Sequence, residues 1–454
     1  MRSRVDPALL SALAVGLVVR LARIARAPLI HPDGPAYLAL ASDLLHGDVR
    51  RVLESYYSPA YPGLVAIAIA AGGSPEVAGR LATAGAGLAA LPLLHTLTRR
   101  LLGARAAGVA VLTAALHPAL VKAAADVLPE TLAGAFLLMW LVVLVRAQGT
   151  VGLAAAGALA GAAYLARPEG VLLVPLGVAW AVRRQHRAAL VAYVVAALLV
   201  MSPALVALHA RSGLWQLSPR EARLAATAAV GAEPTLVATL VHHPVALLAR
   251  TLVGGATQLV YDAKALGVLL AVPFVVGLAG AAGRATVGPL LVAACFTALP
   301  LALNPSPRYA VPLVPLLLPS TAAGLLALGE RLGRRARPVA AALAAGLVVQ
   351  ALWISHPFDA ACAREVQELL LERYGPGESL VAVDGRFAYR AHGRPVVPRT
   401  TAPDDALALA RRESARLWLT RPSWLPPDWR PPPDARPVAR PCGGTFVLFE
   451  LARS

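Results

Sequence analysis

Charged residues are scarce in this sequence of 454 residues. Asp, Glu, Lys and Arg make up 15% of it, against about 25% in soluble domains. Aromatic residues account for 5% and there are 3 cysteines, whereas hydrophobic residues reach 57%. The high apolar content excludes a disordered chain, and the few cysteines exclude a disulfide-rich secreted module. With a mean hydropathy of +0.63, a polytopic membrane protein fits better than a wholly soluble enzyme.

Lysine is nearly absent, because Lys122 and Lys264 are the only two lysines among 42 basic residues. The formal net charge is +17. A nucleic-acid-binding protein would gather such charge on one soluble face, with aromatic residues between the basic ones. Here the arginines lie in short clusters between apolar runs, which membrane topology explains better. We therefore expect the lipid bilayer, and no nucleic acid, as a partner.

Apolar runs of about 20 residues are long enough to span a bilayer as helices. They predict an all-α polytopic membrane protein with about 11 transmembrane helices, in a range of roughly 10 to 13. The first run, residues 7–24, competes with a cleaved signal peptide, because Ala25-Arg26-Ala27 resembles a cleavage site; the many later spans favour an uncleaved helix. Residues 61–71 form a shorter apolar stretch that suits the membrane interface. The other predicted spans are residues 77–97, 106–116, 129–145, 151–164, 170–182, 188–209, 265–283, 286–303, 310–328 and 338–354.

The distribution of arginine predicts the orientation of these spans. With the N-terminus in the cytoplasm, the short outer connections hold one cation each, Lys122, Arg167 and Arg308, as the positive-inside rule expects. Arg20 and Arg23, at the outer end of the first span, are expected to snorkel or to meet anionic headgroups or the phosphate of a lipid carrier. The inner segments then hold Arg2, Arg4, Arg99, Arg100, Arg105, Arg146, Arg183, Arg184, Arg187, Arg284, Arg331, Arg334, Arg335 and Arg337.

This topology divides the chain into a transmembrane module, residues 1–355, and a small extracytoplasmic α/β domain, residues 356–454. The module has two long outer loops, and the second of them contains an amphipathic stretch. In the C-terminal domain, Cys362 and Cys442 can form a disulfide if they lie outside the cytoplasm. The outer loops are residues 28–76 and 210–264, with the amphipathic stretch at 234–260. Periodicity predicts C-terminal helices at 359–374 and 404–413, strands at 379–383, 416–420 and 445–451, and a Pro-rich loop at 422–441.

Acidic and basic residues recur at the predicted outer ends of the spans. Asp33 precedes a stretch of helical periodicity (Tyr37, Leu40, Ala41, Leu44 and Leu45), which predicts an amphipathic helix lying on the membrane surface. A plain helix cap is the competing role for Asp33.

Asp126 and Glu130 flank Pro129, where a carboxylate can also stabilise the helix dipole by about 0.3–1 kcal/mol. Arg167 and Arg308 occupy later outer connections. Ionisable groups near the hydrocarbon region are functional candidates because burying them is costly, although each arginine can instead snorkel to the interface.

These motifs resemble those of a known superfamily. The pattern Asp33-x-x-x-Tyr37-x-x-x-Ala41-x-x-Leu44-x-x-Gly47 resembles the first-loop signature of the GT-C membrane glycosyltransferases, in particular the dolichyl-phosphate-mannose–protein mannosyltransferases and the lipid A aminoarabinose transferases. Many relatives have Asp-Glu where this chain has Asp33-Gly34, so the second acidic group of that pair is absent. Further agreement, in order, comes from Ser58-Pro-Ala-Tyr-Pro-Gly63, Glu130, Tyr164-Leu-Ala-Arg-Pro-Glu-Gly170 and Arg308-Tyr-x-x-Pro-Leu-x-Pro315.

The resemblance implies a GT-C-like fold in a bacterial inner membrane and a polyprenyl-phosphate-sugar-dependent hexosyl- or pentosyltransferase. Such an enzyme moves a sugar from the carrier to a glycan, lipid or protein acceptor on the outer face, with inversion by a single displacement. Asp33 is then the expected base and Glu130 the second catalytic carboxylate. Arg308, with Arg167 and Lys122, is expected to bind the donor phosphate, and Tyr37, Asp126 and Tyr309 to line the acceptor or donor pocket.

The cofactor and the class of protein stay open at this point. The outer histidines lack metal-ligand spacing, but Asp33 and Glu130 are able to hold a divalent ion, because hard cations prefer oxygen ligands. A multi-pass lipid or solute transporter or flippase is one alternative, and it would show repeated halves and charges in mid-span. A non-catalytic envelope-assembly protein with a degenerate site is another, given the missing acidic residue at Gly34.

Overall fold

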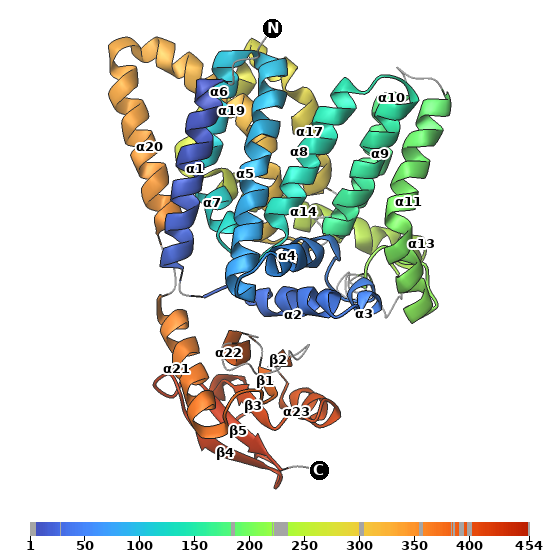
Figure 1. The fold of residues 1–454 in the computed structure, drawn as a ribbon, viewed down its shortest axis with the longest axis vertical. Helices are drawn as coiled ribbons and strands as arrows, with labels where there is room; N and C mark the ends of the chain where they lie inside the picture. Colours follow the sequence, from blue (N-terminus) through green and yellow to red (C-terminus); the bar gives the residue numbers. More distant parts are fainter. Residues whose placement is uncertain are drawn as a thin grey trace. The chain divides into compact units, whose positions relative to one another are not determined.

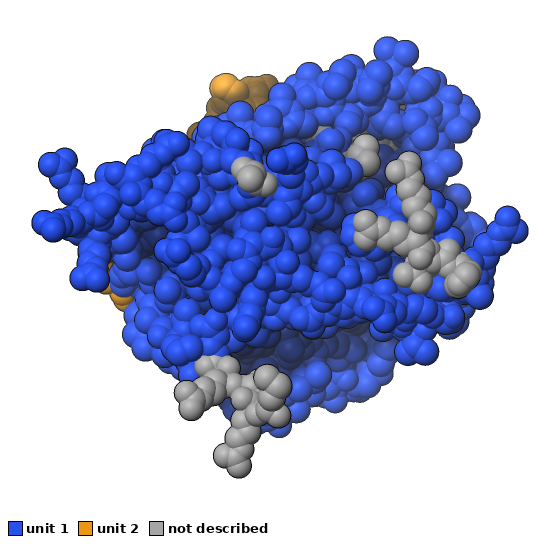
Figure 2. Space-filling view, turned by 90° about the horizontal axis from the view of Figure 1, so that it is seen from above, with its two compact units in different colours: residues 1–25, 40–353 blue, residues 26–39, 354–454 orange. Residues whose placement is uncertain are grey.

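The chain forms two compact units, which Figure 2 distinguishes by colour. Unit 1 comprises residues 1–25 and 40–353, and unit 2 comprises residues 26–39 and 354–454. The computed structural model describes residues 6–27, 29–182, 187–219, 221, 235–298, 304–353, 357–382, 384, 386–389, 395–396 and 402–452. Predicted features outside the described residues are Arg2, Arg4, Arg183, Arg184, residues 222–234 of the second outer loop and residues 299–303 of one span.

Unit 1 is a bundle of helices, in which α1, α5, α8, α9 and α11 run side by side (Figure 1). The first elements are α1 (Pro7–Arg26), α2 (Gly34–Leu45, which starts in unit 2), α3 (Val49–Leu53), α4 (Ala60–Ala70), α5 (Pro75–Leu102), α6 (Ala104–Leu116), α7 (Pro118–Ala124), α8 (Glu130–Arg146) and α9 (Gly149–Ala166). The 3-10 turn η1 (Pro168–Leu172), α10 (Leu173–Ala181), α11 (Arg187–Ser212), α13 (Leu236–His242), α14 (Pro244–Leu266), α15 (Val268–Ala279) and α16 (Ala281–Ala285) follow. The last are α17 (Val287–Ala298), η2 (Pro307–Leu313), α19 (Val314–Leu332), η3 (Gly333–Arg335) and α20 (Ala336–Leu352).

Apolar length singles out the candidate membrane spans. Among the described residues, five helical segments are long and apolar enough to cross a bilayer, and up to seven if each of two bent pairs counts as one span. The pair α6 and α7 is bent by 55° at His117. Helices α4, α15 and α17 are apolar but have 11 or 12 residues each. The mostly helical architecture is confirmed, while the number of spans stays a prediction.

Helix α14 exposes its apolar face and buries its polar one. Gln258 and Asp262 are buried, whereas Leu252, Val253 and Leu259 are exposed. Gln258 donates a hydrogen bond to Asp262 at 2.9 Å, so the buried polar groups have partners. Such a helix suits lipid surroundings, and with α13 it forms a pair bent by 116° that qualifies as a broken span or a re-entrant loop. Part of the second expected outer loop, residues 210–264, is therefore a candidate membrane segment in the structure.

Glycines let α15 and α19 pack backbone to backbone. A Cβ atom on Gly277 would lie 1.8 Å from the carbonyl oxygen of Ser320, and one on Gly324 would lie 1.7 Å from that of Pro273. No side chain larger than hydrogen fits at such distances. Small residues at a helix interface are typical of membrane bundles, in which close van der Waals packing replaces the hydrophobic effect.

Unit 2 contains a five-stranded sheet in the order β2-β1-β3-β5-β4. The β1 strand pairs in parallel with β2 and β3, and β5 pairs antiparallel with β3 and β4. Strands β1, β3 and β5 are almost entirely buried, so two layers of side chains cover them. The elements are α21 (Pro357–Tyr374), β1 (Leu380–Ala382), α22 (Arg386–Tyr389), β2 (Pro395–Val396), α23 (Pro403–Arg412), β3 (Leu417–Thr420), η4 (Pro422–Trp424), β4 (Ala435–Ala439) and β5 (Val447–Leu451).

The predicted α/β domain is thus present, but one of its segments differs from the expectation. We expected a loop at residues 422–441 because of its prolines, and the structure places strand β4 there. The strand lies at the edge of the sheet and its register shifts between Pro437 and Ala439. A proline is tolerated at such a position because an edge strand has one row of unpaired backbone groups and a bulge needs no regular ladder bond.

A disulfide joins Cys362 of α21 to Cys442, just before β5, as the sequence allowed. Both cysteines are buried in a core with Leu370, Leu417 and Leu448. The bond closes a loop of 80 residues, which restrains the unfolded chain and contributes about 2–5 kcal/mol in small secreted domains.

Replacing Gly324 by alanine should lower the thermal stability of the protein. The added methyl group meets the backbone of α15, and overpacking of this kind costs about 1–3 kcal/mol. Gly329 lies on the same helix with no atom within 4 Å of its Cβ position, so Gly329→Ala is the matched control and should be neutral or stabilising. Thermal unfolding of both purified variants in detergent measures the difference. Equal midpoints would contradict the packing described for α15 and α19.

Candidate functional site

The candidate site is built around Glu130, the first residue of α8. Pro129 precedes it at the N-cap, where a proline needs no backbone N–H. The Glu130 side chain is 1% exposed. Its Oε1 atom accepts a hydrogen bond from Arg167 Nη1 at 2.8 Å and lies 3.7 Å from Arg308 Nε. A buried carboxylate requires such partners, because an isolated charge inside a protein is strongly unfavourable.

Arg167 is the residue between α9 and η1, and its backbone is extended. Its guanidinium also donates to both carboxylate oxygens of Glu169, at 3.1 and 3.2 Å. The turn is tight because Gly170 packs on α9: a Cβ there would lie 2.4 Å from the carbonyl carbon of Ala163. The Arg-Pro-Glu-Gly motif therefore folds back on its own helix and points Arg167 at α8.

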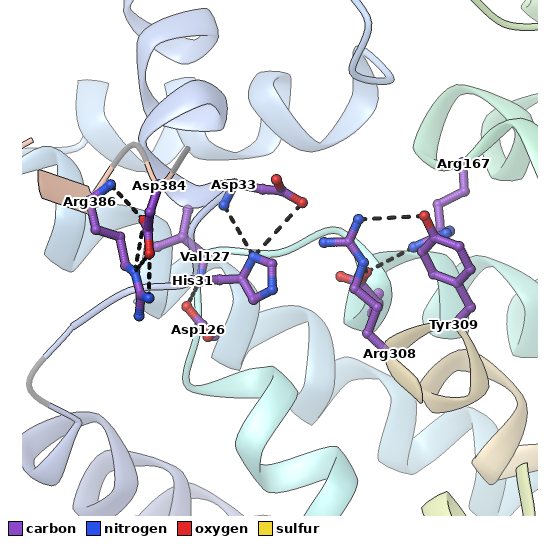
Figure 3. Close-up of polar contacts among 10 residues, drawn as sticks. His31, Asp33, Asp126, Val127, Arg167, Arg308, Tyr309, Asp384 and Arg386 are labelled. Atoms are coloured by element: carbon purple, nitrogen blue, oxygen red, sulfur yellow. Dashed lines mark hydrogen bonds and ion pairs between the residues drawn. The ribbon is translucent and has the colours of Figure 1, made fainter. Parts of the chain in front are cut away.

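Arg308 and Tyr309 lie in the 3-10 turn η2, and Figure 3 shows both next to Arg167. The guanidinium carbons of Arg167 and Arg308 lie 4.3 and 5.2 Å from the centre of the Tyr309 ring. Arg308 also approaches the Tyr309 hydroxyl at 3.5 Å. The Arg308 side chain is 28% exposed, so it remains accessible, whereas Arg167 is buried.

The carboxylates of this cluster hold Arg167 in its protonated state. Burial by itself lowers the pKa of the Arg167 guanidinium, but Glu169 and Glu130 outweigh burial and raise that pKa above its ordinary value. Arg167 therefore stays protonated at every accessible pH. Two guanidiniums face the fully buried carboxylate of Glu130, and Arg308 is the partly exposed one of the two.

The second oxygen of Glu130 belongs to a small cavity behind the cluster. The cavity measures about 30 Å³, and Arg20, Thr131 and Glu130 line it together with apolar side chains of α5, α8 and α19. Among the described residues, Glu130 Oε2, Thr131 Oγ1 and Arg20 Nε have no hydrogen-bond partner. A Cβ at Gly87 would lie 3.0 Å from Thr131 and 3.3 Å from Arg20 Nε, so this glycine makes room for both side chains. A cavity of this size and polarity has room for water.

The snorkelling expected of Arg20 is wrong, because its side chain is 1% exposed. Arg20 donates to the carbonyl oxygens of Gly16 and Ala115, at 3.1 and 3.2 Å. Arg23 instead donates to the carbonyl oxygens of Leu352 and Trp353 at the end of α20. Both arginines therefore bind helix ends and backbone inside unit 1.

Asp33 and Tyr37 belong to unit 2. Asp33 directly precedes α2, and its carbonyl oxygen accepts from the amides of Ala36 and Tyr37, so the predicted helix start is present. The Asp33 carboxylate lies 3.8 Å from His31 Nδ1, which also accepts a hydrogen bond from the Asp33 amide. Tyr37 is buried on the predicted apolar face of α2.

Two other predicted residues have described contacts outside the arginine cluster. Asp126 accepts a hydrogen bond from the amide of Val127 at 2.8 Å, which caps the turn between α7 and α8. Lys122 lies on α7 and lines a different cavity from those of Glu130 and Arg167. The described contacts therefore bring together Glu130, Arg167 and Arg308, but not Lys122.

Sequence reasoning missed Glu169 and Thr131 as parts of this site, and it did not place Arg20 beside Glu130. Glu169 stands two residues after Arg167, and a carboxylate so close to a lone outer arginine is a signal that the sequence does contain. Arg20 carries no such signal, because an arginine near the end of an apolar run usually reaches the interface.

A metal ion does not fit at Glu130. Its carboxylate is already paired with one guanidinium and faces a second, and a divalent cation would be repelled by both. No group of three His, Cys, Asp or Glu side chains with metal-binding geometry occurs among the described residues. The reaction at this site is therefore written without a metal ion at Glu130.

Comparison with known proteins identifies the architecture. Residues 57–208, about a third of the chain, match the family model described as dolichyl-phosphate-mannose-protein mannosyltransferase. The structure of ArnT from Cupriavidus metallidurans bound to undecaprenyl phosphate is similar over 97% of this chain and 97% of that chain, with a TM-score of 0.61 and 15% identity. An oligosaccharyltransferase of Archaeoglobus fulgidus in complex with Zn and sulfate is similar over 91% and 68%, with a TM-score of 0.53 and 13% identity.

A further structure, of the A. fulgidus oligosaccharyltransferase AglB with an inhibitory peptide and a dolichol-phosphate, has a TM-score of 0.50 at 13% identity over 91% of this chain and 69% of that one. At these identities the likeness concerns the fold. A search of curated protein sequences gives no significant match. In its fold and in the matched segment, this chain is similar to GT-C glycosyltransferases, the resemblance that its motifs predicted.

Arg167→Met should destabilise the protein, because it removes the main partner of a buried carboxylate. Breaking a buried pair from one side costs about 3–5 kcal/mol, whereas replacing both partners by apolar residues is often nearly neutral. The double variant Arg167→Met/Glu130→Leu should therefore recover much of the lost stability. Arg146→Met, on the exposed end of α8, is the control. Thermal unfolding in detergent tests this, and a double variant less stable than Arg167→Met alone would contradict the pairing.

Proposed function

We propose that this protein is a membrane glycosyltransferase that moves a hexose or pentose from a polyprenyl-phosphate carrier to a hydroxyl of a glycan, lipid or protein on the outer face of a bacterial inner membrane. The observation that carries the proposal is the arginine cluster: Arg308, partly exposed, and Arg167, buried, lie against Tyr309 and share the carboxylate of Glu130. Enzymes that transfer a phosphate-linked group need fixed cations at the leaving phosphate.

The donor of such an enzyme needs little acid catalysis. In the proposed step the acceptor oxygen forms a bond to the anomeric carbon, the bond from that carbon to the phosphate oxygen breaks, and the carrier leaves as a phosphate monoester anion. Arg308 binds this anion as its negative charge grows, and the buried guanidinium of Arg167 adds a second positive charge beside it. A single displacement of this kind inverts the anomeric centre.

The acceptor hydroxyl loses its proton in the same step, and the first-loop motif makes Asp33 the proposed base. The Asp33 carboxylate lies 3.8 Å from His31 Nδ1. Glu130 Oε1 already accepts a hydrogen bond from Arg167 and lies close to Arg308. We therefore assign Glu130 to holding the two cations, with its second oxygen free to accept a hydrogen bond.

The likeness to lipid-phosphate-binding proteins supports this proposal. ArnT was solved with undecaprenyl phosphate and AglB with dolichol-phosphate. The disulfide between Cys362 and Cys442 supports an outer location for unit 2, because such bonds persist in oxidising compartments and are rare in the cytosol.

Mass analysis of envelope glycans, glycolipids and glycoproteins from cells with and without the chain tests the proposal. Cells that lack it should lack one hexose- or pentose-bearing species, which names donor and acceptor together. Arg308→Gln should reduce its formation about 10²–10³-fold, the usual cost of removing one group that stabilises the transition state, and Asp33→Asn should also abolish it.

Glu330→Gln and Arg146→Gln are the matched controls, since both side chains are exposed, and they should restore the product in full. Immunoblots of membranes show whether each variant inserts. An unchanged glycan profile with inserted Asp33→Asn and Arg308→Gln proteins would contradict the proposal, and movement of a solute without a lipid-linked donor would favour a transporter.

A further inference from the structure

A second polar cavity of unit 1 lies where α7, the junction of α14 and α15, and the end of α20 meet. Its volume is about 380 Å³, which falls within the range of about 300–1,000 Å³ usual for small-molecule sites. It shares no lining residue with the cavities at Glu130 and Arg167. Its lining comprises His117, Pro118, Ala119, Lys122, Lys264, Ala265, Leu266, Gly267, Leu269, Leu347, Gln350 and Trp353.

Positively charged side chains gather at this cavity. Both lysines of the chain line it, Lys122 from α7 and Lys264 from the last turn of α14. Arg23 adds a third cation close by, because it donates to the carbonyl oxygen of Trp353. None of the described lining residues is acidic. Two ammonium groups from separate helices in one cavity repel each other unless an anion lies between them.

The gathering of the two lysines is informative because arginine supplies the other 40 of the 42 basic residues. The planar guanidinium of arginine suits fixed ion pairs with carboxylates, such as the pair with Glu130. A lysine presents a compact point charge with three donors on a flexible stem, which suits a mobile tetrahedral anion such as phosphate.

His117 also belongs to the lining of this cavity. It is 1% exposed, and its Nε2 atom donates to the carbonyl oxygen of Leu266 at 3.1 Å. Its Nδ1 atom is buried as well, so the imidazole shapes the wall of the cavity, and the two lysines are the cationic donors of the described lining.

One side of the cavity is apolar. Leu266, Leu269 and Leu347 belong to its lining, and Trp353 at its edge is 66% exposed. Tryptophan is typical of membrane interfaces, where one end of a site is apolar and the other is wet.

We propose that this cavity binds the phosphate group of an anionic ligand, which Lys122 and Lys264 hold from two separate helices. Two ammonium groups attract a singly charged phosphodiester as well as a phosphate monoester, which bears about −1.5 to −2 charges near pH 7. The chemistry is shared by a lipid headgroup and by a free phosphate ester. This site is separate from the arginine cluster and does not rest on the proposed function.

The full-length protein, purified in detergent, tests the site by native mass spectrometry and thermal unfolding. Three probes are used: phosphatidylglycerol, whose phosphate carries an unmasked negative charge; phosphatidylcholine, whose phosphate is masked by a quaternary ammonium; and inorganic phosphate. Phosphatidylglycerol should bind and raise the unfolding temperature, and phosphatidylcholine should not. Protection by inorganic phosphate as well would show that a free phosphate suffices, whereas protection by the lipid alone would assign the site to a headgroup.

Lys122→Met/Lys264→Met should weaken phosphatidylglycerol binding at least about tenfold, the effect of losing a hydrogen bond to a charged group. Lys122→Arg/Lys264→Arg, which keeps the charge, should retain binding. Arg146→Met is the control for loss of a cation elsewhere. Equal retention of the two lipids by the unmodified protein, or undiminished binding by the methionine double variant, would overturn the proposal.

If the methionine variant does not fold, the comparison of lipids on the unmodified protein decides the matter alone. The outcome is distinct from that of the sugar-transfer experiment, because no lysine variant alters Arg167, Arg308 or Glu130.

Discussion

A carboxylate buried in the membrane unit governs the candidate site. Glu130 is 1% exposed, and a charge in such surroundings is stable only with partners at hydrogen-bond distance. Arg167 satisfies one oxygen at 2.8 Å and Arg308 stands within 3.7 Å of it. These two residues come from chain segments that follow α9 and precede α19, so the pairing fixes the ends of three helices at one place. The same pairing holds the partly exposed guanidinium of Arg308 at the edge of the cluster.

The rest of unit 1 shows how a membrane helix bundle supports such a cluster. Gly170 permits the turn that aims Arg167, and Gly87 makes room for Arg20 and Thr131 behind Glu130. Where α15 and α19 meet, Gly277 and Gly324 bring the backbones into contact. Small residues thus set the spacing of the helices, and the few charged side chains occupy the positions that this spacing opens.

Sequence patterns predicted the architecture because hydropathy and helical period are local properties. Most helices of unit 1, and the elements α21, α23, β1, β3 and β5 of unit 2, lie where periodicity placed them. Strand β4 was missed because proline content says little about an edge strand. The exposed apolar face of α14 was not foreseeable either, since periodicity defines two faces without saying which one packs against the protein.

The candidate site was predictable in part for a related reason. Order along the chain and the side of the membrane singled out Glu130, Arg167 and Arg308 as candidates, and the structure joins them. The sequence could not show that Arg20 turns inward or that Lys122 meets Lys264 in another cavity, because these pairings depend on how distant helices pack. Long-range contacts of this kind leave no trace in spacing or composition.

The central claim is that the arginine cluster binds the phosphate of a polyprenyl carrier. Equilibrium binding of undecaprenyl phosphate to the purified full-length protein tests it most directly, because no sugar and no acceptor need be known. The account predicts that Arg308→Gln weakens this binding at least about tenfold while Arg146→Gln leaves it unchanged. Equal affinity of the Arg308→Gln variant and the unmodified protein would contradict the account.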